Sequence, residues 1–337
     1  MADIDTSPLE RWLDQHVPGY RGPSALVAVV GGVSNPTFRL DAASGRYVLR
    51  RKPMGVLLAS AHAVEREFRV LRALADSAVP VPHAHALCED DGVIGSAFYV
   101  MDHIDGRTLH DATLPGMTAT ERGAVYASMN ETIAALHGID PDSVGLDDFG
   151  RPSHYLARQV ARWTKQYRAS ETTPIAAMDA LIDWLPHHIP AFEATAIVHG
   201  DFRLDNLLLH PTEPRVVAVL DWELSTLGHP LADFAYHVMA WRLTPGLFRG
   251  VAGADLSMLG IPDEAAYVAA YCARTGQPVP ADCDVYMVFG LFRIAAIMQG
   301  VLKRALDGTA ASPEALDVGA RARPVAELAW ELARGLG

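Results

Sequence analysis

The sequence predicts an α+β protein of two lobes, a small antiparallel sheet with one helix and then a larger, mainly helical lobe. The chain has 337 residues, which exceeds the roughly 250–300 at which one hydrophobic core stops growing. Short strand-like runs bounded by Gly and Pro dominate the first part, whereas apolar residues recur at helical spacing from Thr118 onward. We therefore place one lobe at 1–103 and the second at 104–337.

In the first lobe, a short helix is expected at 8–16, before three antiparallel strands joined by the turns GGVSNP and AASG. Helical spacing at 59–75 passes through Val64, Phe68 and Leu71, and the segment VPVP then breaks the pattern. A further strand pair completes a small sheet with one helix. The predicted strands are 27–30, 37–41, 47–50, 84–89 and 97–102.

The second lobe is predicted to be mainly α-helical, with one short β insertion. Two apolar runs, 207–209 and 216–220, flank the turn-like segment HPTEPR and are expected to pair as a hairpin. The predicted helices are 118–137, 153–169, 174–188, 230–242, 263–275, 284–306 and 313–335.

Composition and charge exclude several classes of protein. The formal net charge is −12 and only three residues are lysines, so no basic stripe favours nucleic acid as a partner. The three cysteines have neither disulfide-framework nor zinc-site spacing, which favours reduced thiols. The amino terminus does not resemble a secretory signal, and the apolar segment 285–301 is short and interrupted by Arg293. We expect a soluble, cytoplasmic protein with no membrane partner.

The strongest chemical signal is HGDFRLDN at 199–206, followed after the hairpin by DWE at 221–223. If the hairpin strands are antiparallel, Asn206 and Asp221 lie at the same end of the hairpin. An amide oxygen and a carboxylate are hard ligands that suit Mg²⁺, which keeps its other positions for water and nucleotide phosphates. Asp201, on the adjoining loop, is left to accept a proton. The alternative is that HGD forms a turn and Asp221 caps a helix, but the joint spacing favours phosphoryl-transfer chemistry.

The motif HGDxxxxN with an Asp after a hairpin resembles that of the aminoglycoside phosphotransferase family, relatives of eukaryotic protein kinases. The resemblance implies a protein-kinase-like fold and the transfer of phosphate from ATP, with Mg²⁺, to a hydroxyl of a small molecule. It implies that Asp201 is the catalytic base and that Asn206 and Asp221 bind magnesium. It also implies that Asp233, in GHPLADFAYHV, braces the catalytic loop. We interpret His199 as a structural member of that loop.

The first lobe is expected to bind the nucleotide. GGVSN at 31–35 lies between two strands, where Gly32, Ser34 and Asn35 would let backbone amides approach phosphate, although an ordinary hairpin is the alternative. In YVLRRKP at 47–53, the resemblance expects Val-x-Lys. Arg50 occupies the position of the phosphate-binding lysine, and Lys52 competes with it two residues later.

A helix and a strand end carry the other nucleotide contacts that the resemblance implies. In EREFRVLRAL, Glu67 is the expected ion-pair partner of Arg50, with Glu65 as the alternative. FYVMDHIDG at 98–106 resembles the hinge that binds adenine through its backbone. ATP is the expected donor, and the sequence leaves GTP open. The hinge residues are Met101, Asp102, His103 and Ile104.

Three stretches outside the catalytic motif resemble one branch of the family, the kinase-like module of acyl-CoA dehydrogenase family members 10 and 11 and its free-standing bacterial relatives. The branch implies a 4-hydroxyacyl-CoA or a hydroxy acid as acceptor. Arg158 and Arg162 form a basic stripe with Lys165 on a predicted helix, which could bind the acceptor or simply face solvent. Arg293 is a lone charge in an apolar helix and must be paired or face a cavity. The stretches are 93–107, 145–167 and 289–308.

Other functions stay open. A kinase acting on an aminoglycoside or macrolide antibiotic would share these motifs, and the net acidity mildly favours a cationic acceptor. A non-catalytic nucleotide-binding protein would have no use for the base Asp201. A metal-dependent hydrolase using His199, Asp201 and Asp221 would usually show further histidines. The apolar face at 313–335 could close the core or meet a second subunit, so the oligomeric state is not predicted.

Overall fold

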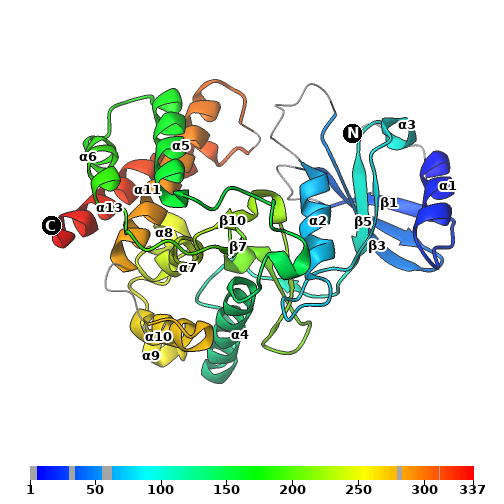
Figure 1. The fold of residues 1–337 in the computed structure, drawn as a ribbon, viewed down its shortest axis with the longest axis horizontal. Helices are drawn as coiled ribbons and strands as arrows, with labels where there is room; N and C mark the ends of the chain where they lie inside the picture. The colour runs from blue at the N-terminus through cyan, green and yellow to red at the C-terminus, as the bar shows by residue number, and fades with distance from the viewer. Residues whose placement is uncertain (1–5, 30–34, 55–62, 279–282, 311) are drawn as a thin grey trace. The chain divides into compact units, whose positions relative to one another are not determined.

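The computed structural model describes residues 6–29, 35–54, 63–278, 283–310 and 312–337, which form two compact units (Figure 1). Unit 1 comprises Met1–Arg107, Leu208–Thr212 and Val216–Ser225. Unit 2 comprises Thr108–Leu207, Glu213–Arg215 and Thr226–Gly337. Most of the hairpin around HPTEPR thus belongs to the amino-terminal unit, whereas the sequence-based boundary assigned all of 104–337 to the second lobe.

A five-stranded antiparallel sheet forms the centre of unit 1, in the order β1-β2-β3-β5-β4. The helix α2 packs against β4 and β5, and its apolar stripe includes the buried residues Val70 and Leu74. In the strand register, Arg50 of β3 lies opposite Thr37 of β2 and Tyr99 of β5. The elements are α1 (Thr6–His16), β1 (Ser24–Ala28), β2 (Thr37–Ala42), β3 (Gly45–Arg51), α2 (Val64–Leu74), β4 (Ala84–Cys88), α3 (Asp91–Ile94) and β5 (Phe98–Asp102).

Two bounds in unit 1 differ from the predictions. The strand β1 covers Ser24–Ala28 instead of 27–30, because it lies at the edge of the sheet and leaves Ala25 and Val27 exposed. The apolar residues of β1 therefore did not predict where the strand begins and ends. The helix predicted at 59–75 is observed as Val64–Leu74, and residues 59–62 lie outside the described part of the chain.

Unit 2 is mainly α-helical, as predicted, and the 24-residue helix α11 (Cys283–Leu306) packs against α5, α7, α12 and α13. By length and composition α11 could cross a membrane, and 78% of its most apolar window is buried inside the protein. The other helices are α4 (Ala119–His137), α5 (Tyr155–Ser170), α6 (Ala176–Trp184), α7 (Pro230–Val238), α8 (Pro245–Phe248), α9 (Leu256–Leu259), α10 (Glu264–Thr275), α12 (Ala315–Ala320) and α13 (Ala322–Leu336).

Proline explains why two predicted helices are divided. The segment 313–335 forms α12 and α13, because Pro324 has no N–H to donate to the preceding turn and is tolerated only near the start of a helix. The segment 174–188 forms α6, which ends at Trp184, and then a 3-10 turn that contains Pro186.

The predicted hairpin is present, as β8 (Leu207–Leu209) and β9 (Val216–Val219) in a three-stranded sheet of order β6-β8-β9. The short strand β6 (Arg107–Thr108) joins it, and the Arg107 side chain donates a hydrogen bond of 3.0 Å to the His210 carbonyl. A second small sheet pairs β7 (Ala196–Val198) with β10 (Thr226–Gly228) in antiparallel fashion. The sequence did not indicate β6, β7 or β10, because two or three residues are too few to show periodicity.

Candidate active site

The His-Gly-Asp turn follows directly from the buried strand β7 in unit 2. Gly200 has a φ of +82°, which lies in the left-handed region that glycine adopts without steric cost. The carboxylate of Asp233, on α7, accepts hydrogen bonds of 2.8 Å from the backbone amides of both His199 and Gly200. His199 is itself fully buried. The turn is therefore held through its backbone, and the side chain of Asp201 is left to project from it.

Asp233 is ionised although it is buried. Burial by itself would raise the pKa of Asp233, but a hydrogen bond from His137 and the amides of the turn lower it below its ordinary value. His137 Nε2 lies 3.2 Å from the Asp233 carboxylate, and its Nδ1 lies 2.7 Å from the hydroxyl of Tyr271. A chain of side chains from α10 and α4 thus supports the turn.

Asp201 is fixed by three side chains but is not sealed from solvent. Tyr236 donates a 2.8 Å hydrogen bond from its hydroxyl to Oδ1 of Asp201, and the Asn206 amide donates one of 2.9 Å to Oδ2. Arg203 Nε lies 3.1 Å from the same Oδ2. The Asp201 side chain retains 17% of its accessible surface. An oriented, accessible carboxylate of this kind can accept a proton from a bound hydroxyl group.

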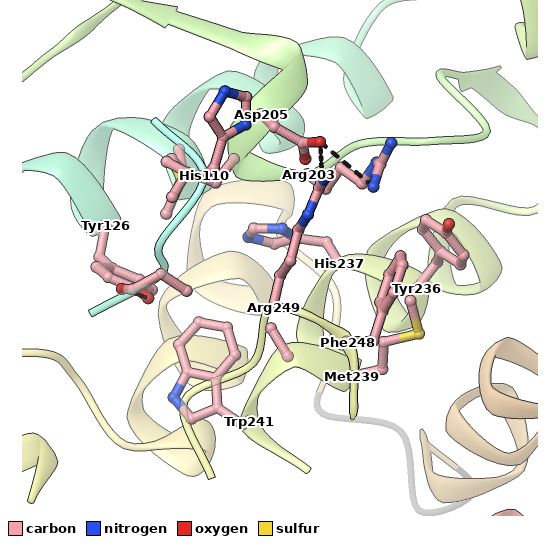
Figure 2. A pocket seen from close by; sticks show the side chains of 14 residues that line it. His110, Tyr126, Arg203, Asp205, Tyr236, His237, Met239, Trp241, Phe248 and Arg249 are labelled. Atoms are coloured by element: carbon pink, nitrogen blue, oxygen red, sulfur yellow. Dashed lines mark hydrogen bonds and ion pairs between the residues drawn. The ribbon is translucent and has the colours of Figure 1, made fainter. Parts of the chain in front are cut away.

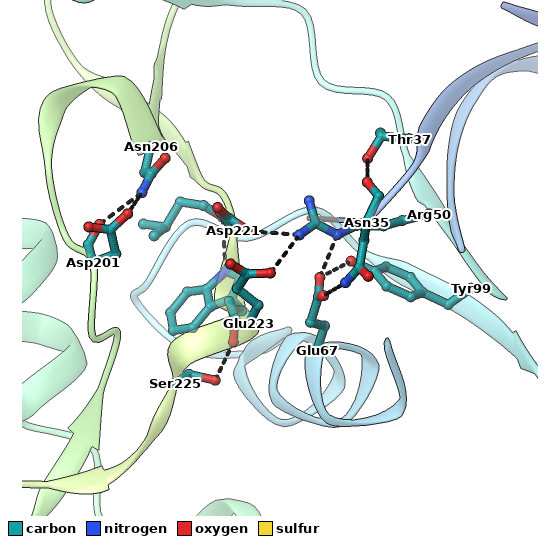
Figure 3. Close-up of polar contacts among 12 residues, drawn as sticks. Asn35, Thr37, Arg50, Glu67, Tyr99, Asp201, Asn206, Asp221, Glu223 and Ser225 are labelled. Atoms are coloured by element: carbon teal, nitrogen blue, oxygen red, sulfur yellow. Dashed lines mark hydrogen bonds and ion pairs between the residues drawn. The ribbon is translucent and has the colours of Figure 1, made fainter. Parts of the chain in front are cut away.

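The amide of Asn206 has a defined orientation (Figure 3). Its Nδ2 donates to both the backbone carbonyl and the carboxylate of Asp201, each at 2.9 Å. Among the described residues nothing donates to the Asn206 amide oxygen. That oxygen is a hard donor atom of the type that Mg²⁺ prefers.

In unit 1, a buried polar cluster joins β3 to α2 (Figure 3). Arg50 Nε lies 2.8 Å from Oε2 of Glu67, whose side chain is only 1% exposed. Asn35 Nδ2 donates a 2.7 Å hydrogen bond to Oε1 of Glu67, and Tyr99 donates one of 3.0 Å to Oε2. Burial raises the pKa of Glu67, and Arg50 opposes that change. Burial likewise disfavours the charged form of Arg50, but Glu67, Tyr99 and Asp221 together outweigh it, so the pKa of Arg50 is raised.

The two candidate cations of β3 have different partners. Arg50 pairs with Glu67, as the resemblance implies, whereas Lys52 pairs with Glu65. Arg50 is also the more buried of the two, with 13% of its side chain exposed against 27% for Lys52. The Arg50 guanidinium therefore occupies the interior position next to α2, and Lys52 lies nearer to solvent.

Asp221 adopts a conformation that is uncommon for a residue with a side chain. Its φ is +66°, in the left-handed region. Arg50 Nη2 donates a 2.7 Å hydrogen bond to its Oδ1, and among the described residues nothing donates to its Oδ2. Residues held in such conformations occur preferentially at functional sites. The described residues contain no group of three or more His, Cys, Asp and Glu side chains that could hold a metal ion.

The other predicted nucleotide contacts are only partly visible. Gly32 and Ser34 lie outside the described residues. Asn35 is buried, and its side-chain amide nitrogen donates a hydrogen bond to Glu67. The predicted hinge lies at the end of β5, where the chain leaves the sheet after Asp102.

The three arginines predicted to contact the acceptor lie in different environments. Arg158 and Arg162 are exposed on α5, and Arg158 donates to the backbone carbonyl of Arg151. Arg293, on α11, is 8% exposed and donates a 2.5 Å hydrogen bond to the Gly200 carbonyl. Of these three arginines, Arg293 alone contacts the His-Gly-Asp turn.

A cavity of about 50 Å³ lies in unit 2 beside two residues that contact Asp201 (Figure 2). Its lining includes Arg203 and Tyr236, two of the three residues whose side chains contact the carboxylate of Asp201. Near them, Asp205 pairs with both Arg203 and Arg249. Much of the remaining wall is aromatic or apolar and comes from distant parts of the chain, which is why no local motif marks it. These residues are Ala112, Tyr126, Met129, Leu204, Met239, Ala240, Trp241 and Phe248.

Comparisons with known sequences identify the family of the chain. Residues 25–286 match the model of a family described as the phosphotransferase enzyme family. Over 314 residues the chain is 48% identical to acyl-CoA dehydrogenase family member 10 of Mus musculus, covering 93% of this chain and 29% of that protein. Over 340 residues it is 42% identical to family member 11 of Rattus norvegicus, covering 98% and 43%. The chain thus spans less than half the length of these relatives.

Solved structures show the same fold. A Ralstonia eutropha protein, provisionally described as an aminoglycoside phosphotransferase, is 55% identical with a TM-score of 0.93, and 99% of each chain is covered. Choline kinase of Cryptosporidium parvum is 14% identical with a TM-score of 0.67, covering 98% and 96%. The aminoglycoside phosphotransferase APH(4)-Ia, solved with AMP-PNP and hygromycin B, is 19% identical with a TM-score of 0.64, covering 97% and 98%. The predicted protein-kinase-like fold is confirmed.

Proposed function

The chain belongs to the phosphotransferase enzyme family, and on that premise we propose that it is a kinase that phosphorylates a hydroxyl group of a small molecule. The observation that carries the proposal is the environment of Asp201. Its carboxylate is oriented by Tyr236, Asn206 and Arg203 and still reaches solvent. A carboxylate that is held in one orientation and is still partly exposed can accept a proton from a bound hydroxyl group.

Asp201 acts as the base in this proposal. It accepts the proton of the acceptor hydroxyl as that oxygen bonds to the terminal phosphorus of the nucleotide, and the bond from phosphorus to the departing ADP breaks. The three side chains around Asp201 keep its carboxylate in one orientation. Less conformational entropy is therefore lost when the transition state forms.

Two of the predicted ligands have donor atoms that suit Mg²⁺. Asn206 of unit 2 and, separately, Asp221 of unit 1 each present a hard oxygen that no described residue engages, and we propose each of them as a magnesium ligand. Bound Mg²⁺ would neutralise charge on the phosphates. Arg50 would hold phosphate oxygens, because its planar guanidinium can bind them bidentately. Crystals of the structural neighbour APH(4)-Ia contained AMP-PNP, which supports ATP as the donor.

For the acceptor we propose a 4-hydroxyacyl-CoA or a related hydroxy acid. Identity of 42–48% to the acyl-CoA dehydrogenase family members over nearly the whole chain supports this choice. An aminoglycoside is the second candidate, because the Ralstonia eutropha protein with 55% identity carries that provisional description. The APH(4)-Ia complex contains hygromycin B, but that protein is only 19% identical to this chain. At this level of identity the acceptor of one protein does not indicate the acceptor of the other.

The deciding experiment is ATP consumption with Mg²⁺ against four acceptor classes, with the phosphorylated product identified by mass spectrometry. The classes are 4-hydroxyacyl-CoA thioesters, free hydroxy acids, aminoglycosides and macrolides. We expect turnover with the thioesters or hydroxy acids. Turnover with an antibiotic alone would contradict the acceptor assignment but keep the kinase. Tight ATP binding without phosphate transfer to any class would contradict the kinase assignment and favour a non-catalytic nucleotide-binding protein.

A further inference from the structure

Arg293 is a buried cation in the middle of α11, a helix whose buried residues are mostly apolar. The side chains of Phe292 and Ile294, its neighbours in sequence, are buried as well. Burying a charge in such a place costs free energy unless the charge is paired. In the part of the chain that the structure describes, no carboxylate lies within ion-pair distance of the Arg293 guanidinium, and its Nε has no hydrogen-bond acceptor.

The contacts of Arg293 converge on Asp201 by two routes. Through the backbone, Nη2 of Arg293 donates a 2.5 Å hydrogen bond to the carbonyl of Gly200, the residue before Asp201. Through a side chain, the guanidinium carbon lies 4.6 Å from the ring centroid of Tyr236, whose hydroxyl donates to Oδ1 of Asp201. The guanidinium carbon is also 5.3 Å from the ring centroid of Trp163 on α5.

The chemistry of arginine suits both routes at once. Its guanidinium group is planar, so it can lie over an aromatic ring while an N–H in the same plane donates to a carbonyl. A lysine could donate to the Gly200 carbonyl but would not present a flat surface to Tyr236. A methionine of similar length could fill the space between the rings but would donate nothing.

We propose that Arg293 is a positioning residue for Asp201, one that sets the conformation of the His-Gly-Asp turn and the orientation of Tyr236 without touching the reactants. The role rests on the proposed function of Asp201 as the base. It replaces the expectation that Arg293 binds the acceptor. Arg293 contacts the turn from the protein interior, through the Gly200 carbonyl, and most of its surface is covered by protein.

The test compares Arg293→Met and Arg293→Lys with a matched control on the same helix. Gln299 is also a buried polar residue of α11, but its amide donates to the Ser170 carbonyl and the Thr172 hydroxyl, with no contact to the turn. Gln299→Met should therefore reproduce the loss of a buried polar contact without affecting Asp201. Each variant is assayed for kcat, for KM of the acceptor and for nucleotide affinity.

We expect Arg293→Met to lower kcat by about 100-fold, the size of effect that a misplacement of about 1 Å produces, with nucleotide affinity unchanged. Arg293→Lys should recover part of the loss, since one hydrogen bond can be restored. In the double variant Arg293→Met with Tyr236→Phe, the fold-loss of kcat should be smaller than the product of the two single fold-losses. The reason is that Arg293 and Tyr236 both act through Asp201. A raised KM with normal kcat in Arg293→Met would overturn the proposal and restore an acceptor-binding role. A kcat of Arg293→Met equal to that of Gln299→Met would also overturn it.

Hydrogen–deuterium exchange provides a readout that does not depend on any acceptor. The backbone amides of His199 and Gly200 donate to Asp233, and that of Asn206 donates to the Arg203 carbonyl. Exchange in 199–206 should accelerate in Arg293→Met and stay at the wild-type rate in Gln299→Met. If the acceptor panel were silent, faster exchange would still support the positioning role while the kinase assignment failed. Unchanged exchange in both arginine variants would refute it.

Discussion

Nε of Arg50 lies 2.8 Å from Oε2 of Glu67, and this ion pair joins strand β3 to helix α2 at a buried position in unit 1. Breaking a buried pair by removing one charge costs more than the pair itself contributes, because the remaining charge stays buried without a partner. The same contact fixes the side chain that we propose holds phosphate. Stability and nucleotide binding are therefore coupled at this residue pair.

Replacing Glu67 by Gln should destabilise the protein by about 3 kcal/mol and weaken ATP binding, since Arg50 loses its orienting partner. Glu65→Gln is the matched control, because Glu65 lies on the same helix and pairs with the more exposed Lys52. That variant should have near-normal stability and a small effect on affinity. Urea unfolding and isothermal titration calorimetry measure the two effects. Equal losses in both variants would mean that Lys52 is as important as Arg50.

Replacing Asp201 by Asn should leave nucleotide binding intact and lower kcat by at least 100-fold, since general base catalysis typically contributes 10² to 10⁴. The change removes proton acceptance but keeps the size of the side chain and much of its hydrogen bonding. Single-turnover kinetics, together with nucleotide affinity, would test it. Normal turnover in this variant would refute the assignment of the base.

Replacing Asp221 by Asn should weaken the magnesium-dependent part of ATP binding by about tenfold or more, because a neutral amide is a poorer ligand for Mg²⁺ than a carboxylate. Glu223→Gln is the control: its carboxylate lies near the same arginine, 4.0 Å from Arg50, but is not a proposed ligand. Affinities measured with Mg²⁺ and with EDTA isolate the metal contribution. If Asp221→Asn and Glu223→Gln gave the same magnesium dependence, the proposed metal ligand would be misplaced.

The buried side chain of His237 should make stability fall in mild acid. Burial lowers the pKa of His237 from 6.5 to about 4. Between these values the unfolded chain binds a proton that the folded protein does not, so the free energy of unfolding decreases as pH falls through this range. Between pH 7 and pH 5 the loss attributable to His237 is about 2 kcal/mol.

Urea unfolding of wild type and His237→Gln at pH 7 and pH 5 measures this loss. The variant should be less stable at pH 7, because the 2.8 Å hydrogen bond between His237 and Tyr267 is altered. It should nevertheless show a pH dependence smaller by about 2 kcal/mol. His154→Gln, at a side chain that is 81% exposed, should leave the slope as in wild type. A wild-type slope in His237→Gln would show that the pKa of His237 is not lowered in the folded protein.

Much of the fold followed from local patterns in the sequence. Helices such as α4 and α10 lie within a residue of their predicted ends, because several turns of apolar periodicity and strong caps mark them. The hairpin of β8 and β9 was likewise predicted from two apolar runs and a turn. Short strands and 3-10 turns were missed, since their stability comes from tertiary packing rather than from a repeated pattern.

The residues of the candidate site likewise include some that local sequence patterns predicted and some that they did not. The spacing of Asp201, Asn206 and Asp221 indicated the chemistry, because these residues lie close in sequence around one hairpin. The partners of Asp201 could not be predicted in this way. Tyr236 and Arg293 are 35 and 92 residues away along the chain, and only the packing of α7 and α11 brings them to the turn.

By itself, the sequence determined the phosphotransferase family and the two-lobed fold class, because the HGDxxxxN motif and the helix and strand periodicities are local patterns. The tertiary structure decided which of two cations pairs with Glu67, and it showed that Arg293 contacts the His-Gly-Asp turn from the interior. Side-chain contacts across α5, α7 and α11 depend on how whole helices pack. That packing is a property of the complete core, and no short segment of sequence encodes it.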